Sequence, residues 1–151
     1  MLELARYEDR EAINALALQV HELHIAWQPE YYDHTDLLYD EARFLNSLDQ
    51  GILYVAKMNG EIIGYVALPI IEIFHSGLKP MKTMKVDELC VAEGYRSRGI
   101  GKQIMEDVKS IAKKMGCSDI RLTCAPQNTA AIALYEGMGM QIKNFQYFLL
   151  I

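Results

Sequence analysis

The spacing of apolar residues predicts a short strand followed by a helix at the start of the chain. Residues 2–6 alternate between apolar and polar side chains, a period of two that is typical of a half-buried strand. Apolar residues then recur three and four positions apart, which predicts an amphipathic helix. These residues are Ile13, Leu16, Ala17, Val20 and Leu23. The periodicity is lost over residues 25–40, and a second short helix is expected to end near residue 48.

Two β-rich runs occupy the middle of the chain, residues 52–58 and 61–73. They are joined by Asn59-Gly60, a dipeptide that fits a type I′ turn because both central residues of that turn need a positive φ. A β-hairpin is therefore predicted here. A further strand is expected over residues 83–92.

The second half of the chain alternates predicted helices and strands. Helical periodicity covers residues 100–115 and is followed by a short strand over residues 119–124. A second helix is expected over residues 128–137, opened by an asparagine cap, and then a terminal strand or hairpin arm over residues 141–151. The complete order of elements indicates one mixed sheet covered by helices, in the α+β class.

Composition places the chain among globular proteins. Its 151 residues are the size of one domain, so residues 1–151 are expected to form a single domain. A hydrophobic content of 51%, a charged content of 23% and a mean hydropathy near zero exclude a disordered or collagen-like chain. No apolar run is long enough to span a bilayer, and charges interrupt the amino-terminal region where a signal peptide would be apolar. No membrane partner and a cytoplasmic location are expected.

The charge distribution indicates where an anion could bind. The net charge of −5 argues against a nucleic-acid partner, because such proteins usually carry a basic excess. Residues 1–50 hold three basic and eleven acidic side chains, whereas residues 76–116 hold nine basic and five acidic ones. This second segment could receive phosphates, although a solvated helix face explains the same charges.

Neither the cysteines nor the histidines form a recognisable metal site. The three cysteines contain no CxxC pair and are interpreted as small buried apolar groups. His21 and His24 lie close together in one predicted helix, but no third ligand has a matching spacing. No metal is expected.

A glycine-containing loop between a predicted strand and a predicted helix has the sequence VAEGYRSRGIGKQIM. In that position, free backbone N–H groups and the positive end of the helix dipole can bind an anion. A Walker A motif would need a lysine where Ile100 stands, and a dinucleotide fingerprint would need a glycine where Ile104 stands. The pattern R-x-x-G-x-G remains, formed by Arg96, Gly99 and Gly101, with an ordinary turn before a helix as the alternative.

The run DELCVAEGYRSRGIGKQIM, followed by NTAAIALYEGMGM, resembles the GCN5-related N-acetyltransferase (GNAT) family. The first run is similar to that family's coenzyme A pyrophosphate loop, and the second to its N-x-x-A-x-x-x-Y-x-x-x-G helix. The predicted order of elements agrees with the family fold over nearly the whole chain. The resemblance implies a three-layer α/β/α fold of the α+β class, with a mixed, mostly antiparallel central sheet of six to seven strands and about four helices. It also implies a single N-acetyltransferase domain that uses acetyl-CoA.

The resemblance further implies which residues bind acetyl-CoA. The pantetheine arm would bond to main chain near two positions of a splayed strand, and the pyrophosphate would be held by backbone N–H groups of the glycine-containing loop. The cofactor-binding residues implied are Leu89, Cys90, Val91, Arg96, Ser97, Arg98, Gly99, Ile100, Gly101, Lys102, Asn128 and Tyr135.

Acetyl transfer to an amine requires a base, because an amine with a pKa of about 10.4 is almost fully protonated at neutral pH. Glu88 matches the acidic strand position of the family and is the predicted general base, acting directly or through water, with Asp87 as the weaker alternative. Strand alternation predicts that Glu88 lies on the same face as Val86 and Cys90.

The departing sulfur requires a donor, and the resemblance implies that Tyr135 is the general acid at this position. Tyr135 lies seven residues beyond Asn128, about two helical turns, so both side chains can point from one face of the helix. The resemblance implies that Asn128 bonds to pantetheine. An asparagine cap and a core tyrosine are the structural alternatives.

The amine acceptor is predicted to bind at the aromatic and acidic segment 25–40. Trp27, Tyr31 and Tyr32 lie among acidic residues there, a composition that suits a cationic amine. An acidic surface with its aromatic residues turned inward is an equal alternative. The sequence does not distinguish a small amine, an amino acid, a peptide amino terminus or a lysine side chain as acceptor.

Two wider questions stay open at the level of sequence. Exposed terminal strands are compatible with a homodimer. The alternative to a transferase is a non-catalytic module that senses or binds acetyl-CoA. Such a module would need only the phosphate loop, so the presence of Glu88, Asn128 and Tyr135 favours catalysis.

Overall fold

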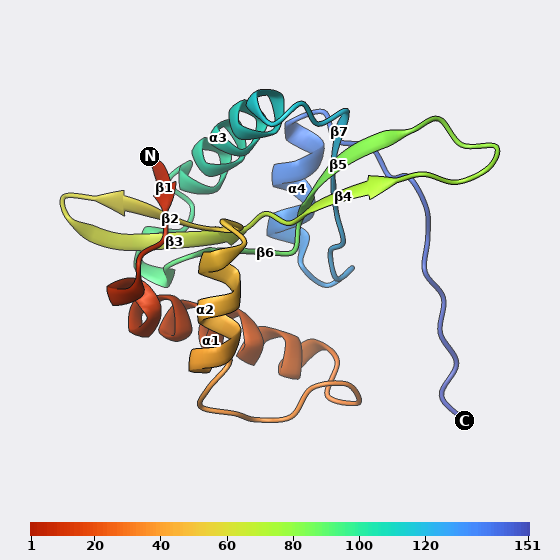
Figure 1. Ribbon diagram of the computed structural model, residues 1–151. Coiled ribbons are helices and arrows are strands. Elements are labelled where there is room, and N and C mark those ends of the chain that lie inside the picture. Colours follow the sequence, from red (N-terminus) through yellow and green to blue (C-terminus); the bar gives the residue numbers. More distant parts are fainter.

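The computed structural model describes residues 1–151 and contains seven strands and four α-helices (Figure 1). In chain order these are β1 (Leu2–Leu4), α1 (Arg10–Trp27), α2 (Glu41–Asp49), β2 (Leu53–Met58), β3 (Glu61–Ala67), β4 (Ile70–Ile73), β5 (Met81–Val86), β6 (Glu88–Val91), α3 (Ile100–Lys114), β7 (Asp119–Leu122) and α4 (Thr129–Gly137). The predicted α+β class is confirmed. None of the helices combines the length and the apolar character needed to cross a bilayer.

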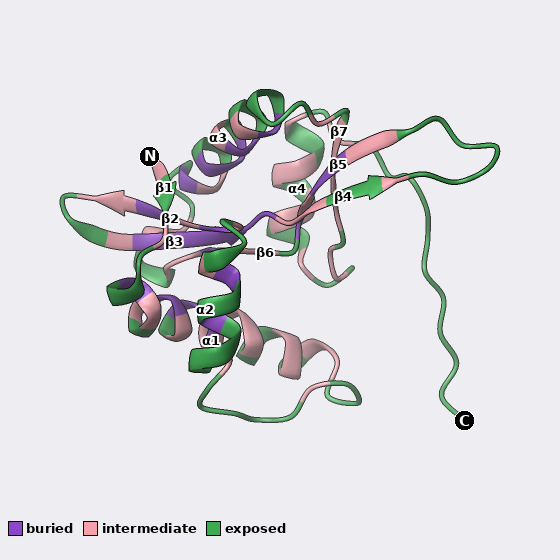
Figure 2. Cartoon of the chain, viewed as in Figure 1, coloured by how far each residue is buried: buried purple, intermediate pink, exposed green.

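The helices cover the strands from two sides, which gives three layers. On one side α1 and α2 contribute Ile13, Leu16 and Phe44 to a buried apolar cluster that also contains Val55 and Tyr65 of the strands. On the other side α3 packs its buried face onto a second cluster, and α4 lies beside it (Figures 1 and 2). The central strands β2 and β3 therefore contribute buried side chains to both clusters.

The predicted hairpin is present, because β2 and β3 pair antiparallel across Asn59-Gly60. Both turn residues have positive φ values, 52° and 82°, as a type I′ turn requires. The first helix, the helix after the glycine-containing loop and the capped helix α4 also occupy the predicted regions. The hairpin and these three helices, which depend on the pattern of neighbouring residues, were thus predictable from the sequence.

The strands form two sheets where the sequence pattern predicted one. The sheet β1-β2-β3-β6 is antiparallel, whereas in the sheet β4-β5-β7 the strands β5 and β7 run parallel. The break lies at Pro69 between β3 and β4, and at Asp87 between β5 and β6. Pro69 has no N–H to continue the ladder, and only its carbonyl oxygen is bonded, by the Lys85 N–H at 2.9 Å. The two sheets therefore separate beside Asp87.

The break at Asp87 corrects the predicted placement of Glu88. Glu88 and Cys90 do share a face, the one that α1 covers, but Val86 packs in the other cluster under α3. The interruption between β5 and β6 shifts the alternation by one position. As a result, the Glu88 carboxylate points toward α1 and α2.

The predicted terminal strand is wrong for this structure. Residues 141–151 are extended but pair with no strand, and all are exposed, as the green chain that leaves the molecule in Figure 2 shows. A strand needs a partner for its backbone groups, and no strand of the same chain bonds to this segment. We call residues 141–151 the C-terminal tail.

Candidate active site

A cavity of about 340 Å³ opens where the two sheets separate. Its walls come from α1, from the start of β6, from the segment that follows β7 and from α4. Glu88, Asn128 and Tyr135 line it together, although they are far apart in the sequence. The structure therefore brings the predicted base, the predicted acid and the predicted pantetheine contact to one cavity.

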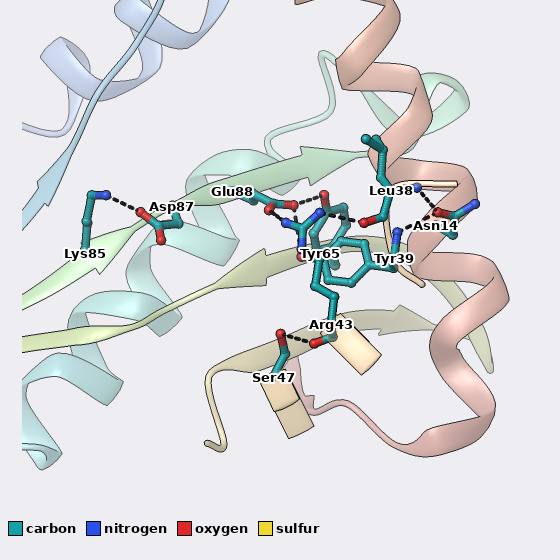
Figure 3. A network of polar contacts seen from close by, with 9 residues as sticks. All are labelled: Asn14, Leu38, Tyr39, Arg43, Ser47, Tyr65, Lys85, Asp87 and Glu88. Carbon is teal, nitrogen blue, oxygen red and sulfur yellow. Dashed lines mark hydrogen bonds and ion pairs between the residues drawn. The ribbon is translucent and has the colours of Figure 1, made fainter. Parts of the chain in front are cut away.

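The Glu88 carboxylate is held by three donors (Figure 3). Its Oε2 accepts hydrogen bonds from the hydroxyl groups of Tyr65, at 2.6 Å, and Tyr39, at 2.9 Å. Its Oε1 accepts from the Arg43 guanidinium, with which it forms an ion pair. Burial, together with the nearby carboxylate, raises the pKa of Tyr65 and of Tyr39, so both remain protonated donors. A carboxylate has about four lone-pair positions, so one position on Oε1 stays free for a water or a substrate.

We call Tyr39, Tyr65 and Arg43 the clamp around the Glu88 carboxylate, and four further contacts hold it in place. Asn14 of α1 accepts hydrogen bonds from the N–H groups of Leu38, at 2.8 Å, and Tyr39, at 2.9 Å. Arg43 donates to the Leu38 carbonyl oxygen at 2.7 Å and lies over the Tyr39 ring, 4.2 Å from its centroid. The loop before α2 is thereby attached to α1, so that Tyr39 of this loop and Arg43 of α2 reach Glu88 (Figure 3).

Tyr135 lines the cavity, and its hydroxyl group has no hydrogen-bond partner in the protein. Burial raises its pKa to about 12, and the nearby Cys124 contributes in the same direction. The hydroxyl forms no hydrogen bond within the protein, whereas those of Tyr39 and Tyr65 do. Tyr135 is thus a protonated donor at neutral pH whose proton is available to a bound molecule.

Asn128 caps α4, as the sequence predicted. Its Oδ1 accepts from the Ala131 N–H at 3.2 Å, and the side-chain amide group has no partner in the protein. Because Asn128 also lines the cavity, this amide can donate to a molecule bound there. The cap and the predicted pantetheine contact are therefore compatible roles of one side chain.

The glycine-containing loop leaves six consecutive backbone N–H groups, those of residues 97–102, without an acceptor in the protein. Ser97 and Gly99 have positive φ values of 60° and 78°, and Gly99 is the N-cap of α3. Successive unbonded N–H groups around left-handed residues, together with a helix amino terminus, form an anion-binding concavity. We call residues 97–102 the anion nest.

One predicted contact of this loop, Arg96, has other partners in the structure, and Gly101 has a second role. The Arg96 N–H donates to the Glu93 carbonyl oxygen, and the Arg96 Nε donates to the Val91 carbonyl oxygen at 2.9 Å. Arg96 therefore fastens the loop to β6. A Cβ added to Gly101 would lie 3.1 Å from Leu134 Cδ2, so this glycine also permits α3 to approach α4.

The free edge of β6 supports two of the three predicted strand contacts. Ala92 donates to the Ile63 carbonyl oxygen of β3, and the antiparallel register then directs the backbone groups of Cys90 to β3 as well. Leu89 and Val91 turn their N–H groups to the open edge. Cys90 is buried, its thiol donates to the Leu16 carbonyl oxygen at 3.2 Å, and burial raises its pKa to about 11. The structure does not bring Cys90 to the edge.

Of the three aromatic residues predicted at the acceptor site, only Tyr32 lines the cavity. Its ring stacks on His24 with ring centroids 5.1 Å apart, and the Trp27 ring is tilted against His24 with centroids 5.9 Å apart. Tyr31 turns away, and its ring contacts Phe148 of the C-terminal tail. Trp27 and Tyr31 thus do not line the cavity.

Sequence reasoning missed several cavity residues. His21 and His24 suggest only metal ligands in the sequence, yet both line the cavity together with Glu88. Burial lowers the pKa of His24, so its ring stays neutral over a wider range of pH than that of an ordinary histidine. A sequence signal did exist, because His21 and His24 are three positions apart and therefore lie on the same face of α1. Nothing local indicated Arg43, which is 45 residues from Glu88.

Comparison with known proteins gives a consistent result. The model of the acetyltransferase (GNAT) family matches residues 17–140. N-acetyltransferase family 8 member 2 of Rattus norvegicus is 32% identical over 108 residues, which cover 72% of this chain and 45% of that protein. An N-alpha-acetyltransferase of Sulfurisphaera tokodaii is 30% identical over 105 residues, 66% of this chain and 62% of that protein. The chain spans about half the length of the rat relatives that it matches.

Solved structures show the same fold. The BH1408 protein of Bacillus halodurans has a TM-score of 0.94 at 24% identity, over 100% of this chain and 99% of that one. An aminoglycoside N-acetyltransferase in complex with CoA has a TM-score of 0.74 at 16% identity, over 100% of this chain and 98% of that one. At these identities the likeness concerns the fold alone.

Proposed function

This chain belongs to the acetyltransferase (GNAT) family, and from that premise we propose that it transfers the acetyl group of acetyl-CoA directly to a primary amine. Residues 1–151 would form a single N-acetyltransferase domain. One observation carries the proposal: a nest of free N–H groups follows the end of β6, and a cavity lined by Glu88, Asn128 and Tyr135 opens at the start of the same strand. The nest suits the binding of a phosphate group, and the three cavity residues suit acyl transfer.

Acetyl-CoA would bind along the open edge of β6. The anion nest, residues 97–102, would hold the pyrophosphate, with Arg98 and Lys102 adding positive charge. Leu89 and Val91 would pair with the pantetheine arm through their free backbone N–H groups, and the Asn128 amide would donate to it. The coenzyme A present in a related fold, the aminoglycoside acetyltransferase, supports this assignment.

Glu88 would act as the base. The amine nitrogen attacks the thioester carbon, a C–N bond forms, and the C–S bond breaks. The proton lost by nitrogen passes to the free position on Glu88 Oε1, directly or through a water molecule. Tyr39, Tyr65 and Arg43 would keep the carboxylate oriented without occupying that position.

Tyr135 would stabilise the departing thiolate. Its pKa of about 12 lies above that of an ordinary thiol, about 8.5, so a hydrogen bond to the sulfur is favoured over complete proton transfer. The thiolate would then take its proton from solvent. This assignment refines the general acid of the sequence prediction into a hydrogen-bond donor at the sulfur.

A cationic amine fits the acceptor side of the cavity. The free lone-pair position on Glu88 Oε1 can accept a hydrogen bond from an ammonium group, and the Tyr32 ring, which lines the same cavity, can contact a cation. The neutral ring of His24 adds no opposing charge at pH 7. An aminoglycoside, the substrate named for one structural relative, is one member of this class.

The proposal is tested by incubating the protein with acetyl-CoA and a panel of primary amines. The panel contains spermidine, an aminoglycoside, free amino acids, and peptides with a free amino terminus or a free lysine. Mass spectrometry of an acetylated amine, with equimolar thiol release, is the expected result. Tight acetyl-CoA binding without any transfer would favour the alternative, a non-catalytic acetyl-CoA-binding sensor or regulatory module.

A charge placed in the anion nest should weaken acetyl-CoA binding. Ser97 is exposed, and asparagine and aspartate both tolerate its positive φ, so Ser97→Asn and Ser97→Asp differ only in charge. A carboxylate beside the pyrophosphate should raise Kd for acetyl-CoA at least about tenfold, whereas the asparagine variant should bind nearly as the wild type does. Isothermal titration measures both. Equal affinities of the two variants would contradict the assignment of the nest.

A further inference from the structure

One side of the cavity is formed by α1 and the loop that follows it. Four side chains of α1 line the cavity at spacings of three and four residues, which places them on one face of the helix, and two side chains of the loop lie beside them. We call these six residues the acceptor wall: Ala17, Val20, His21, His24, Tyr32 and Leu38. Because Glu88 lines the same cavity, an acceptor whose amine reaches Glu88 would place the rest of its body near this wall.

The acceptor wall contains no carboxylate. The composition of residues 25–40 predicted acidic side chains at the acceptor site, but Glu30, Asp33 and Asp36 are exposed and none of them lines the cavity. Three of the six side chains of the wall are aliphatic. An ammonium group placed against aliphatic side chains loses its hydration and gains no acceptor in exchange, which is unfavourable. The acceptor wall therefore suits an uncharged part of the acceptor.

The cavity as a whole contains two carboxylates, those of Asp87 and Glu88. Asp87 Oδ1 forms an ion pair with Lys85 Nζ at 2.6 Å, so the charge of this carboxylate is already balanced. Glu88 is held by the clamp and keeps one free position on Oε1. Figure 3 shows the Lys85–Asp87 pair on the other side of Glu88 from the clamp. The cavity therefore offers a partner to one ammonium group.

Three rings of the acceptor wall contact one another. The Tyr32 ring stacks on His24 with an interplanar angle of 29°, and it meets His21 edge to face, with centroids 5.8 Å apart. His21 Nε2 donates to the Asp33 carbonyl oxygen at 2.8 Å, which fastens the loop to α1. Burial lowers the pKa of His24, so its ring adds no positive charge at pH 7. The three rings offer faces and edges against which an aromatic body can pack.

We propose that the acceptor is a primary monoamine carried on an apolar, aromatic body, of the arylalkylamine class. This inference rests on the proposed acetyl transfer and narrows its acceptors. The ammonium group would bond to Glu88 Oε1, and the aromatic body would pack against the acceptor wall. The reaction is unchanged: nitrogen gives its proton to Glu88, the C–N bond forms and the C–S bond breaks. Polyamines and aminoglycosides carry several ammonium groups, and all but one of these would lack a partner in the cavity.

Two pairs of amines test this inference on the wild-type protein. Hexylamine and cadaverine have the same length and differ at one end, where the first has a methyl group and the second an ammonium group. We expect kcat/KM for hexylamine, measured by thiol release from acetyl-CoA, to be at least about tenfold higher. Phenethylamine should exceed ethylamine by at least the same factor, because only the first has a ring to pack against the wall. A kcat/KM for cadaverine equal to or above that for hexylamine would overturn the inference.

A carboxylate added to the acceptor wall should change this preference. Leu38→Asp and Leu38→Asn have side chains of equal size that differ in charge, and both keep the backbone N–H that bonds to Asn14. The aspartate supplies a partner for a second ammonium group, so the ratio of kcat/KM for cadaverine to that for hexylamine should be at least about tenfold higher in Leu38→Asp than in Leu38→Asn. Equal ratios in the two variants would contradict the placement of the acceptor body. An unchanged Kd for acetyl-CoA shows that the variants are folded.

Direct binding separates this inference from the proposed acetyl transfer. The wild-type protein saturated with CoA is titrated with phenethylamine and with cadaverine in a calorimeter, which requires no reaction. Phenethylamine should bind with a Kd at least about tenfold lower. Tighter binding of cadaverine would overturn the inference whether or not acetyl transfer occurs. Acetylation of cadaverine or spermidine in preference to phenethylamine would overturn it as well, and would leave the transferase activity established.

Discussion

Replacing Glu88 with glutamine is expected to lower kcat/KM for the acceptor amine about 10²- to 10⁴-fold at neutral pH, the range attributed to general bases. The glutamine side chain keeps the shape of glutamate but cannot take a proton. At neutral pH nearly all of the amine is protonated, so the variant would depend on the small fraction that is already free base. Steady-state thiol release with an amine from the acceptor panel measures the loss.

The pH profile makes this prediction specific. As pH rises toward the pKa of an ordinary amine, about 10.4, more of the acceptor reaches the cavity already deprotonated, and the difference between the variant and the wild type should shrink. Affinity for acetyl-CoA should stay within about threefold of the wild type, because Glu88 lies outside the anion nest. A ratio of rates that does not change with pH would contradict the role of Glu88 as base.

Arg43→Met provides the matched control for Glu88. Arg43 pairs with the carboxylate but is placed as its orienting partner, so its loss leaves the base present and less well held. We expect a smaller fall in kcat/KM than for Glu88→Gln and no recovery at high pH. If kcat/KM falls more for Arg43→Met than for Glu88→Gln, and with the pH dependence expected of Glu88→Gln, the guanidinium rather than the carboxylate is the group on which the reaction depends.

The parts of the site that depend on neighbouring residues in the chain were predictable. The anion nest follows from Gly99 and Gly101 before a helix, and the cap of α4 follows from Asn128, because turns and helix ends are set by a few consecutive residues. The same holds for the hairpin turn at Asn59-Gly60.

The clamp around Glu88 could not be predicted in this way. Tyr39, Arg43 and Tyr65 come from a loop, a helix and a strand, and only the packing of α1 and α2 on the sheet brings them together. Their residue types are common and their spacing carries no motif. The separation of the sheets had a local signal in Pro69, but the second break at Asp87 had none.

The tail shows a different limit of sequence patterns. Composition favours a strand over residues 141–151, yet a pattern within one segment does not state which edge it would pair with. In the structure the segment pairs with no strand and stays exposed. The predicted strand is wrong because strand formation depends on a backbone partner that local sequence does not specify.

Replacing Tyr135 with phenylalanine is expected to lower kcat about 10²-fold or more, as removal of a donor at a developing negative charge does in other enzymes. The hydroxyl bonds to nothing within the protein, so the change leaves no polar group without its partner, and phenylalanine keeps the ring packing. Affinity for acetyl-CoA should therefore hardly change. Tyr54→Phe is the matched control, because Tyr54 is also partly buried with a raised pKa but lies outside the cavity.

The pH dependence separates Tyr135 from Glu88. Burial raises the pKa of Tyr135 to about 12, so the hydroxyl keeps its proton throughout the range in which the enzyme can be assayed. The ratio of wild-type to Tyr135→Phe rates should then be constant from about pH 6 to about pH 10, whereas the ratio for Glu88→Gln falls as the amine deprotonates. If Tyr135→Phe loses acetyl-CoA binding together with turnover, the ring acts in packing. If it retains full turnover, the departing sulfur is stabilised by another group, and Tyr135 has no part in the chemical step.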